Sequence, residues 1–195
     1  MDNNTKVILA SSSPYRQQLL QKLQIDFIAK SPGIDESPYK NELATNQAKR
    51  LAKQKALALS TQFPNHLIIG SDQIAIYNQQ QLTKPGNKES CIFQLQSISG
   101  NTVDFYTGIC VLNTQTMEFR EDIDHCSVSF RKLSLANIET YVDLDKPFNC
   151  AGSFKSEGLG IALIENISGE DPNALIGLPL IKLIDLLNKF GVKIL

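Results

Sequence analysis

The first candidate for chemistry is a polar turn near the start of the chain. A short apolar run at 7–10 is followed by Ser11, Ser13, Pro14 and Arg16. Ser13 is a favourable helix N-cap and proline suits the first helical position, so the segment predicts a strand that turns directly into a helix. Backbone N–H groups at a helix start, serine hydroxyls and a planar guanidinium all bind phosphate oxygens. The alternative is an ordinary capped helix with a surface arginine.

The second candidate is an aspartate inside an apolar run. Asp72 follows Gly70 within the segment 67–76, LIIGSDQIAI, which otherwise has the pattern of a buried strand. Burying a carboxylate without a partner is costly, so an aspartate here needs a reason. We expect Gly70 to allow a kink that exposes Asp72 at a cleft, where the carboxylate would bind a metal or accept a proton from water. The alternative is a turn aspartate between two short strands.

Other charged and polar residues are weaker candidates when taken singly. Glu36 lies in a loop and by itself reads as a solvated charge. Lys55 falls on the edge of the apolar face of a helix expected over 41–59, where its alkyl chain would cover apolar surface. Lys84 precedes a proline and suits a plain turn. The polar loop 153–158 is flanked by glycines, so it either approaches a ligand closely or simply connects two elements.

The elements that would position these residues mix strands and helices throughout the chain. There are no internal repeats and there is no clear linker, which predicts an α/β fold and a single domain over 1–195. Strands are expected at 7–10, 27–28, 67–76, 103–112, 119–130 and 161–164, and helices from 14, over 41–59, over 87–98, from a cap at 134 through 142, and from 179 to near 191.

Composition indicates an ordinary soluble protein and argues against several classes. Hydrophobic residues make up 42% and the net charge is −1, which disfavours non-specific nucleic-acid binding because that needs a basic face. No apolar run approaches the ~20 residues of a membrane span, and the start of the chain does not resemble a signal peptide. The four cysteines lack zinc-site spacing. We therefore expect a reduced, cytoplasmic protein with buried cysteines and with no nucleic-acid or membrane partner.

Taken together, the polar segments resemble those of one family. The motifs A-S-S-S-P-Y-R at 10–16, D-E-S at 35–37, G-S-D-Q at 70–73, K-P at 84–85 and G-S-F-K-S-E-G at 152–158 have the order and spacing of the Maf family of nucleoside triphosphate pyrophosphatases. HLIIGSDQ, FYTGI, CAGSFKSEG and GLPLI look like its YceF-type subfamily, the 7-methyl-GTP pyrophosphatases. The resemblance implies a two-lobed, inosine-triphosphatase-like α/β fold with an elongated mixed sheet flanked by helices and a central cleft. It also implies metal-dependent diphosphate release, often from a homodimer.

The resemblance further implies roles for individual residues. Asp72 matches the family's proton acceptor, and hydrolysis at the α-phosphorus also needs charge neutralisation and a stabilised leaving group. A Mg²⁺ or Mn²⁺ ion is expected to bridge phosphates and carboxylates, with Glu36 and, secondarily, Asp72 as ligands. We favour the base role for Asp72. The phosphate-side loop is matched by Ser11, Ser13 and Arg16, and the polar lining of the cleft by Glu36, Lys55 and Lys84. Of these, Arg16, Lys55 and Lys84 are expected to bind the phosphate oxygens.

Tyr15, Gln73 and Glu157 fall at the positions associated with base selectivity, with tyrosine where tryptophan is familiar. N7-methylation gives guanine a positive charge, which an aromatic face attracts by ~0.5–2 kcal/mol. Glu157 would accept hydrogen bonds from the guanine edge, and Gln73 would add another. We therefore expect 7-methyl-GTP to be hydrolysed to 7-methyl-GMP and diphosphate. The alternatives are a pyrophosphatase for dTTP, UTP or another modified nucleotide, and a nucleotide-binding regulator of cell division or septum formation without important catalysis.

Overall fold

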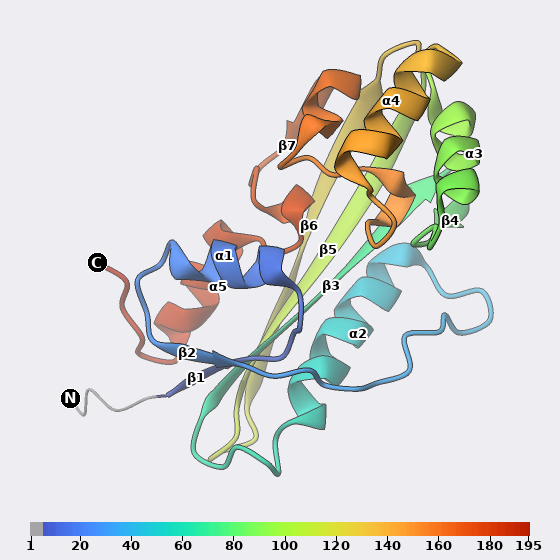
Figure 1. Ribbon diagram of the computed structural model, residues 1–195. Coiled ribbons are helices and arrows are strands. Elements are labelled where there is room, and N and C mark those ends of the chain that lie inside the picture. The colour runs from blue at the N-terminus through green and yellow to red at the C-terminus, as the bar shows by residue number, and fades with distance from the viewer. Residues whose placement is uncertain (1–5) are drawn as a thin grey trace. The chain divides into compact units, whose positions relative to one another are not determined.

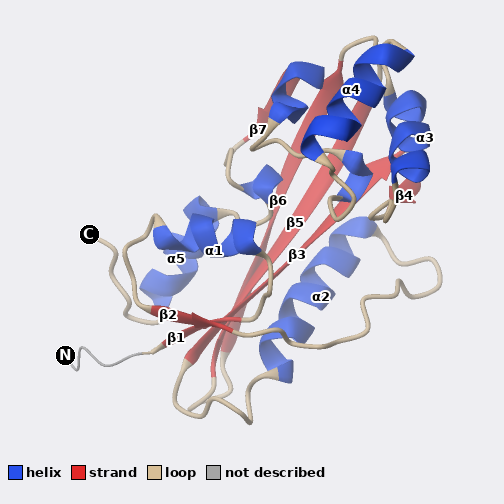
Figure 2. Ribbon diagram, in the orientation of Figure 1, coloured by secondary structure: helices blue, strands red, loops and turns tan. Residues whose placement is uncertain are grey.

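A single mixed sheet runs through the computed structural model, which describes residues 6–195 (Figures 1 and 2). Its strands are β1 (Val7–Leu9), β2 (Phe27–Ala29), β3 (Leu67–Tyr77), β4 (Gln80–Leu82), β5 (Thr102–Asn113), β6 (Phe119–Phe130) and β7 (Ile164–Gly169). The α-helices are α1 (Pro14–Gln21), α2 (Ala44–Ala58), α3 (Lys88–Ile98), α4 (Leu135–Asp145) and α5 (Leu180–Lys189). Short 3-10 helices are η1 (Ala151–Ser153), η2 (Leu159–Leu163) and η3 (Ala174–Ile176).

The strand order is β2-β1-β3-β5-β6-β7, and β4 pairs with β3 outside that order. Strand β1 is parallel to both β2 and β3, whereas the β3–β4 and β6–β7 pairs are antiparallel. The predicted α/β class, with a mixed sheet flanked by helices, is therefore confirmed.

The chain forms two compact units that are interleaved in sequence. The first combines residues up to Asp72 with Thr107–Asp124 and Asp171–Leu195, and the second combines Gln73–Tyr106 with His125–Glu170. Strands β3, β5 and β6 each pass from one unit to the other. The two units correspond to the two lobes that the sequence predicts.

The first unit has apolar side chains on both faces of its sheet. On β1, Val7 and Leu9 join the cluster formed with α1 and α5, while Ile8 joins the cluster formed with α2. Strand side chains alternate between faces, so a strand covered on both sides reads as an uninterrupted apolar run. Figure 1 shows α1 and α5 next to each other, and their leucines share one core cluster.

Helix α2 packs unusually close to the sheet because glycines lie beneath it. A Cβ atom on Gly70 would lie 2.0 Å from the carbonyl oxygen of Ala52, and one on Gly108 would lie 2.3 Å from that of Ala48. Strand β3 continues without interruption through this point. The expected kink at Gly70 is therefore wrong, and so is the alternative of a turn between two short strands. The glycine is there for close helix–strand contact.

The second unit packs α3, α4 and η1 over one core. The Phe154 ring lies at 5.3 Å from Phe130 and 6.2 Å from Phe105, centroid to centroid. Cys91 and Tyr141, from α3 and α4, are buried in the same unit. This core holds the segment that carries the glycine-flanked polar loop.

Two boundary predictions are wrong in this unit. The strand expected at 161–164 is the 3-10 helix η2, and the strand begins at Ile164 and continues to Gly169. Five of the six β7 residues are exposed, so the strand has no apolar pattern to reveal it. Helix α4 extends three residues beyond the predicted end, to Asp145.

The remaining fold-level expectations concern cysteines and membranes. Cys91, Cys110 and Cys126 are buried as predicted, whereas Cys150 is only partly buried. Burial raises the pKa of the Cys150 thiol to about 11. Within residues 6–195, no helix is both long and apolar enough to cross a membrane.

Candidate active site

Lys55 joins two of the predicted carboxylates in the first unit. Its Nζ lies 2.6 Å from Glu36 Oε1 and 2.6 Å from Asp72 Oδ1. Lys55 and Asp72 are only 5% and 6% exposed, while the Glu36 side chain is 48% exposed. The buried aspartate therefore has the partner that its burial requires. It is not exposed by a kink, as the sequence had suggested.

Helix α2 brings Lys55 to this place. The buried face of α2 includes Ala48, Leu51, Ala52 and Lys55, so the lysine lies within the face and not on its edge. The predicted edge position is therefore wrong. A single lysine on the apolar face of a helix predicts an alkyl chain that covers apolar surface and an ammonium that reaches solvent. The pattern of the helix does not reveal that Asp72 on β3 is the partner of this ammonium.

The polar turn after β1 has the predicted strand-to-helix form. Ser13 is the N-cap of α1 and its Oγ accepts a hydrogen bond from the Arg16 N–H at 3.4 Å. Ser11 is buried, and its Oγ accepts from the Ser13 N–H at 3.1 Å. Both hydroxyl oxygens thus act as acceptors within the turn, which leaves the hydroxyl hydrogens for donation to an anion.

Arg16 belongs electrostatically to the Lys55 cluster. Burial lowers the pKa of its guanidinium, while the charges of Asp72 and Glu36 act in the opposite direction. Its Nε donates to the carbonyl oxygen of Gly177 at 2.8 Å. The structure therefore brings Arg16, Glu36, Lys55 and Asp72 together, with two cations and two carboxylates in one place.

Two members of this site were not predicted. Ser71 is fully buried, and its Oγ lies 2.9 Å from the Gly177 carbonyl oxygen and 2.8 Å from that of Gly108. The Gly177 carbonyl thus meets both Ser71 and Arg16. A backbone carbonyl leaves no side-chain signal in a sequence, but a serine next to Asp72 in a buried strand was a usable one.

The loop that carries Glu36 is fastened to α2 by Arg50. The guanidinium donates to both Glu42 carboxylate oxygens at 2.6 Å and to the Ser37 carbonyl at 3.1 Å. It also lies 3.9 Å from the centre of the Tyr39 ring. The hydrogen bond from Arg50 lowers the pKa of Glu42, so this pair is ionised at neutral pH. Arg50 therefore restrains the segment from which Glu36 reaches Lys55.

Four further residues have predicted roles in the site. Tyr15 is partly buried in the first turn of α1. Gln73, Lys84 and Glu157 belong to the second unit, in β3, in the segment between β4 and α3, and between η1 and η2. Lys84 and Glu157 are exposed. The roles expected for these four residues stay predictions.

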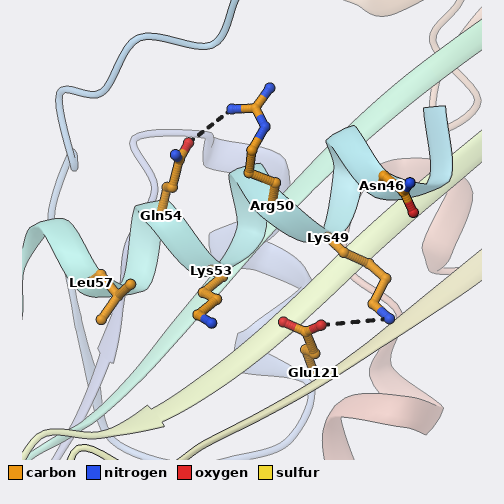
Figure 3. Close-up of a pocket in the computed structure, with 7 residues that line it drawn as sticks. All are labelled: Asn46, Lys49, Arg50, Lys53, Gln54, Leu57 and Glu121. Atoms are coloured by element: carbon orange, nitrogen blue, oxygen red, sulfur yellow. Dashed lines mark hydrogen bonds and ion pairs between the residues drawn. The ribbon is translucent and has the colours of Figure 1, made fainter. Parts of the chain in front are cut away.

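A groove of about 500 Å³ lies on the opposite face of α2 and contains none of the predicted residues (Figure 3). Its charged side chains have partners: Lys49 lies 3.5 Å from Glu121, and Arg50 is bound by Glu42. Lys53 lies over the Phe119 ring. Since 53 and 55 differ by 200° around a helix, this groove and the Lys55 cluster are separated by the helix itself. The groove is not favoured as the active site.

Metal binding by protein side chains alone is not supported. Among the described residues, no three His, Cys, Asp or Glu side chains form a group suited to a metal ion. Glu36 and Asp72 are two carboxylates that both face one cation, the Lys55 ammonium. That donor set fits Mg²⁺ as it is held in phosphoryl-transfer sites, by one or two carboxylates together with substrate phosphates and water.

The site and fold define an α/β protein with a serine-capped helix entry and a buried, ion-paired carboxylate in the same unit. The chain matches the family described as "Maf-like protein" over residues 6–190. It belongs to the Maf family.

Several proteins named 7-methyl-GTP pyrophosphatase are similar to it over nearly their whole length. That of Alcanivorax borkumensis is 53% identical over 193 residues, which is 99% of this chain and 98% of that protein. That of Aliivibrio fischeri is 50% identical over 191 residues, 98% and 99% of the two chains. The Staphylococcus aureus Ham1 structure is a distant neighbour, with 15% identity, a TM-score of 0.46 and coverage of 66% and 73%.

Proposed function

We propose that this chain is a nucleoside triphosphate pyrophosphatase that converts 7-methyl-GTP and water to 7-methyl-GMP and diphosphate. The observation that carries the proposal is the Glu36–Lys55–Asp72 cluster, with Arg16 beside it, in a chain about half identical to relatives of that name. A buried, ion-paired carboxylate next to cations suits attack of water on a phosphate ester or anhydride.

In this proposal Asp72 orients the attacking water and takes its proton. Its Oδ1 is bound to Lys55, while its Oδ2 makes no hydrogen bond within residues 6–195. The contact with the ammonium fixes the position of the carboxylate, so Oδ2 is the atom that would accept the proton. Lys55 is thus a positioning residue for Asp72 in the substrate-free chain.

Arg16, Ser11 and Ser13 would hold phosphate oxygens. The helix start, the two hydroxyls and the guanidinium lie in one short segment and supply donors to an anion. A divalent ion, Mg²⁺ or Mn²⁺, would supply charge neutralisation on the phosphates when bound, with Glu36 and secondarily Asp72 as its protein ligands. We propose Lys84 as a further phosphate contact from the family resemblance alone.

Base selectivity is assigned by the same resemblance. Tyr15 would stack on the base, and Glu157 and Gln73 would bind its edge. The positive charge of 7-methylguanine favours binding to an aromatic face and to a carboxylate. The aromatic contact contributes ~0.5–2 kcal/mol, which is about 2- to 30-fold in affinity. The homodimer and the cytoplasmic location stay predictions as well.

A panel of triphosphates with each divalent ion tests the proposal. We expect diphosphate release with Mg²⁺ or Mn²⁺ and a higher kcat/KM for 7-methyl-GTP than for GTP, dTTP or UTP. Equal values for GTP and 7-methyl-GTP would refute the base assignment, and a preference for dTTP or UTP would place the chain with the alternative substrates. Binding without any diphosphate release would identify a nucleotide-binding regulator instead.

A further inference from the structure

The carbonyl oxygen of Gly177 is the meeting point of two side chains from distant parts of the sequence. Arg16 Nε donates to it at 2.8 Å from α1, and Ser71 Oγ reaches it at 2.9 Å from β3. Arg16 makes no other side-chain hydrogen bond in the described part of the chain. The Gly177 carbonyl is therefore the hydrogen-bond acceptor that orients the guanidinium among the described residues, through Nε.

The turn that presents this carbonyl is itself firmly held. Asp171 is fully buried, and its carboxylate accepts hydrogen bonds from Asn173 N at 2.8 Å and from Ile181 N at 2.7 Å. Thr107 Oγ1 donates to the Ala174 carbonyl at 3.0 Å, and the Gly177 N–H donates to the same carbonyl at 2.9 Å. One buried carboxylate thus ties the turn to the start of α5, so its carbonyl has a fixed direction.

The backbone at this position requires glycine for two reasons. Gly177 has φ +115°, a conformation that side chains rarely adopt. A Cβ atom there would also lie 3.2 Å from Arg16 Nε, the group that the carbonyl holds. A side chain would therefore strain the turn and press on the guanidinium at the same time.

We infer that the Gly177 carbonyl is a positioning group for the phosphate-binding arginine. By accepting from Nε, it turns the outer edge of the guanidinium, with both Nη groups, toward the phosphate oxygens of the nucleotide. A planar fork held in one orientation loses little freedom when it binds an anion, and a displacement of ~1 Å is enough to cost ~10²-fold in rate. Ser71 holds the same carbonyl next to the strand that carries Asp72. The phosphate-binding arginine and the proposed base are therefore anchored to the same backbone carbonyl. This inference rests on the proposed function of the site.

The test compares Gly177→Ala with Gly191→Ala, each in the wild-type and in the Arg16→Lys background. Gly191 also has positive φ, +80°, but a Cβ there meets nothing within 4 Å, so this variant controls for backbone strain. Arg16→Lys keeps the charge but lacks the Nε–H that the carbonyl holds. The full-length variants are titrated calorimetrically with the α,β-methylene analogue of 7-methyl-GTP, which cannot be cleaved at that bond, and kcat and KM are measured for 7-methyl-GTP.

We expect Gly177→Ala to weaken analogue binding about tenfold or more with arginine at position 16, the size of one charge-assisted hydrogen bond. In the Arg16→Lys background, Gly177→Ala should weaken analogue binding no more than Gly191→Ala does. The hydrogen bond from Nε to the Gly177 carbonyl is already absent there. Equal losses in the two backgrounds would overturn the inference, as would equal effects of the two glycine variants.

Ser71→Ala provides a second variant without backbone strain, should Gly177→Ala fail to fold. It should also weaken analogue binding with Arg16 present and have a smaller effect in the Arg16→Lys background; the same loss in both would refute a shared anchor. If the wild-type protein binds the analogue but releases no diphosphate, the proposed activity is refuted. The comparison of analogue binding between the Arg16 and Arg16→Lys backgrounds still tests the role of the Gly177 carbonyl. Wild type that does not bind the analogue would overturn both.

Discussion

Replacing Lys55 with methionine removes the charge between two carboxylates and keeps most of the side chain's volume. Asp72, at 6% exposure, would then be a buried carboxylate without the ammonium that it is hydrogen-bonded to. Breaking a buried ion pair from one side typically costs ~3–5 kcal/mol. Glu36 adds little to this cost because its side chain is 48% exposed and water can solvate it. We therefore expect Lys55→Met to lower the free energy of unfolding by ~3–5 kcal/mol.

The measurement is urea unfolding followed by circular dichroism at pH 7, with Lys53→Met as the matched control. Lys53 lies on the same helix and contacts the Phe119 ring, so its loss should cost only ~0.5–1 kcal/mol. For a chain of this length, each kcal/mol corresponds to ~2–4 °C in Tm, which makes the two variants easy to distinguish.

The double variant Lys55→Met, Asp72→Asn separates charge burial from packing. Removing the carboxylate should recover most of the free energy of unfolding. The loss in Lys55→Met is expected to come from the unpaired buried charge of Asp72 and not from a change in side-chain volume. If Lys55→Met costs no more than Lys53→Met, or if the double variant recovers nothing, the reasoning about the buried pair is refuted.

Further predictions concern activity, pH and packing. Asp72→Asn should lower kcat for diphosphate release by ~10²–10⁴-fold with the circular dichroism spectrum unchanged, and near-normal kcat would exclude it as the base. Arg16→Ala should cost ~10²–10³-fold in kcat/KM, and a loss below threefold would remove its phosphate role. The lowered pKa of Glu42 means that its pairing with Arg50 stabilises the fold fully above the unfolded pKa of ~4.3 and ceases to do so as pH falls through the folded value. The stability advantage of wild type over Glu42→Gln should therefore be constant above ~pH 5.5 and shrink below ~pH 4, and a pH-independent difference would contradict this. Gly70→Ala should destabilise the chain by ~1–3 kcal/mol or more, because its Cβ would lie 2.0 Å from a backbone oxygen of α2; wild-type stability in urea would disprove that contact.

Local signals in the sequence were sufficient for most elements. The capped start of α1 and the uninterrupted apolar run of β1 follow from neighbouring residues, and the structure confirms both. β7 was misplaced because its side chains are mostly exposed, and an exposed strand has no period of burial. The short strand β4 was not predicted, since Gln80–Leu82 has two exposed glutamines and forms its strand by pairing with β3.

The candidate site was predictable in its side chains and not in their contacts. An aspartate in an apolar run signals a constraint, but Asp72 is explained by Lys55, which lies 17 residues earlier on another element. Gly70 was interpreted as a kink because a sequence does not show which helix approaches a strand. Gly177 contributes only a backbone carbonyl, and the contact from Arg16 spans 161 residues. Contacts of this range depend on the tertiary fold, which no local pattern encodes.

The central claim is that water attacks the α-phosphorus of a nucleoside triphosphate. Turnover of 7-methyl-GTP in H₂¹⁸O with Mg²⁺ or Mn²⁺ tests it most directly, by mass spectrometry of both products. We predict one ¹⁸O atom in 7-methyl-GMP and none in diphosphate. Label in the diphosphate, or release of labelled inorganic phosphate with 7-methyl-GDP, would contradict the claim.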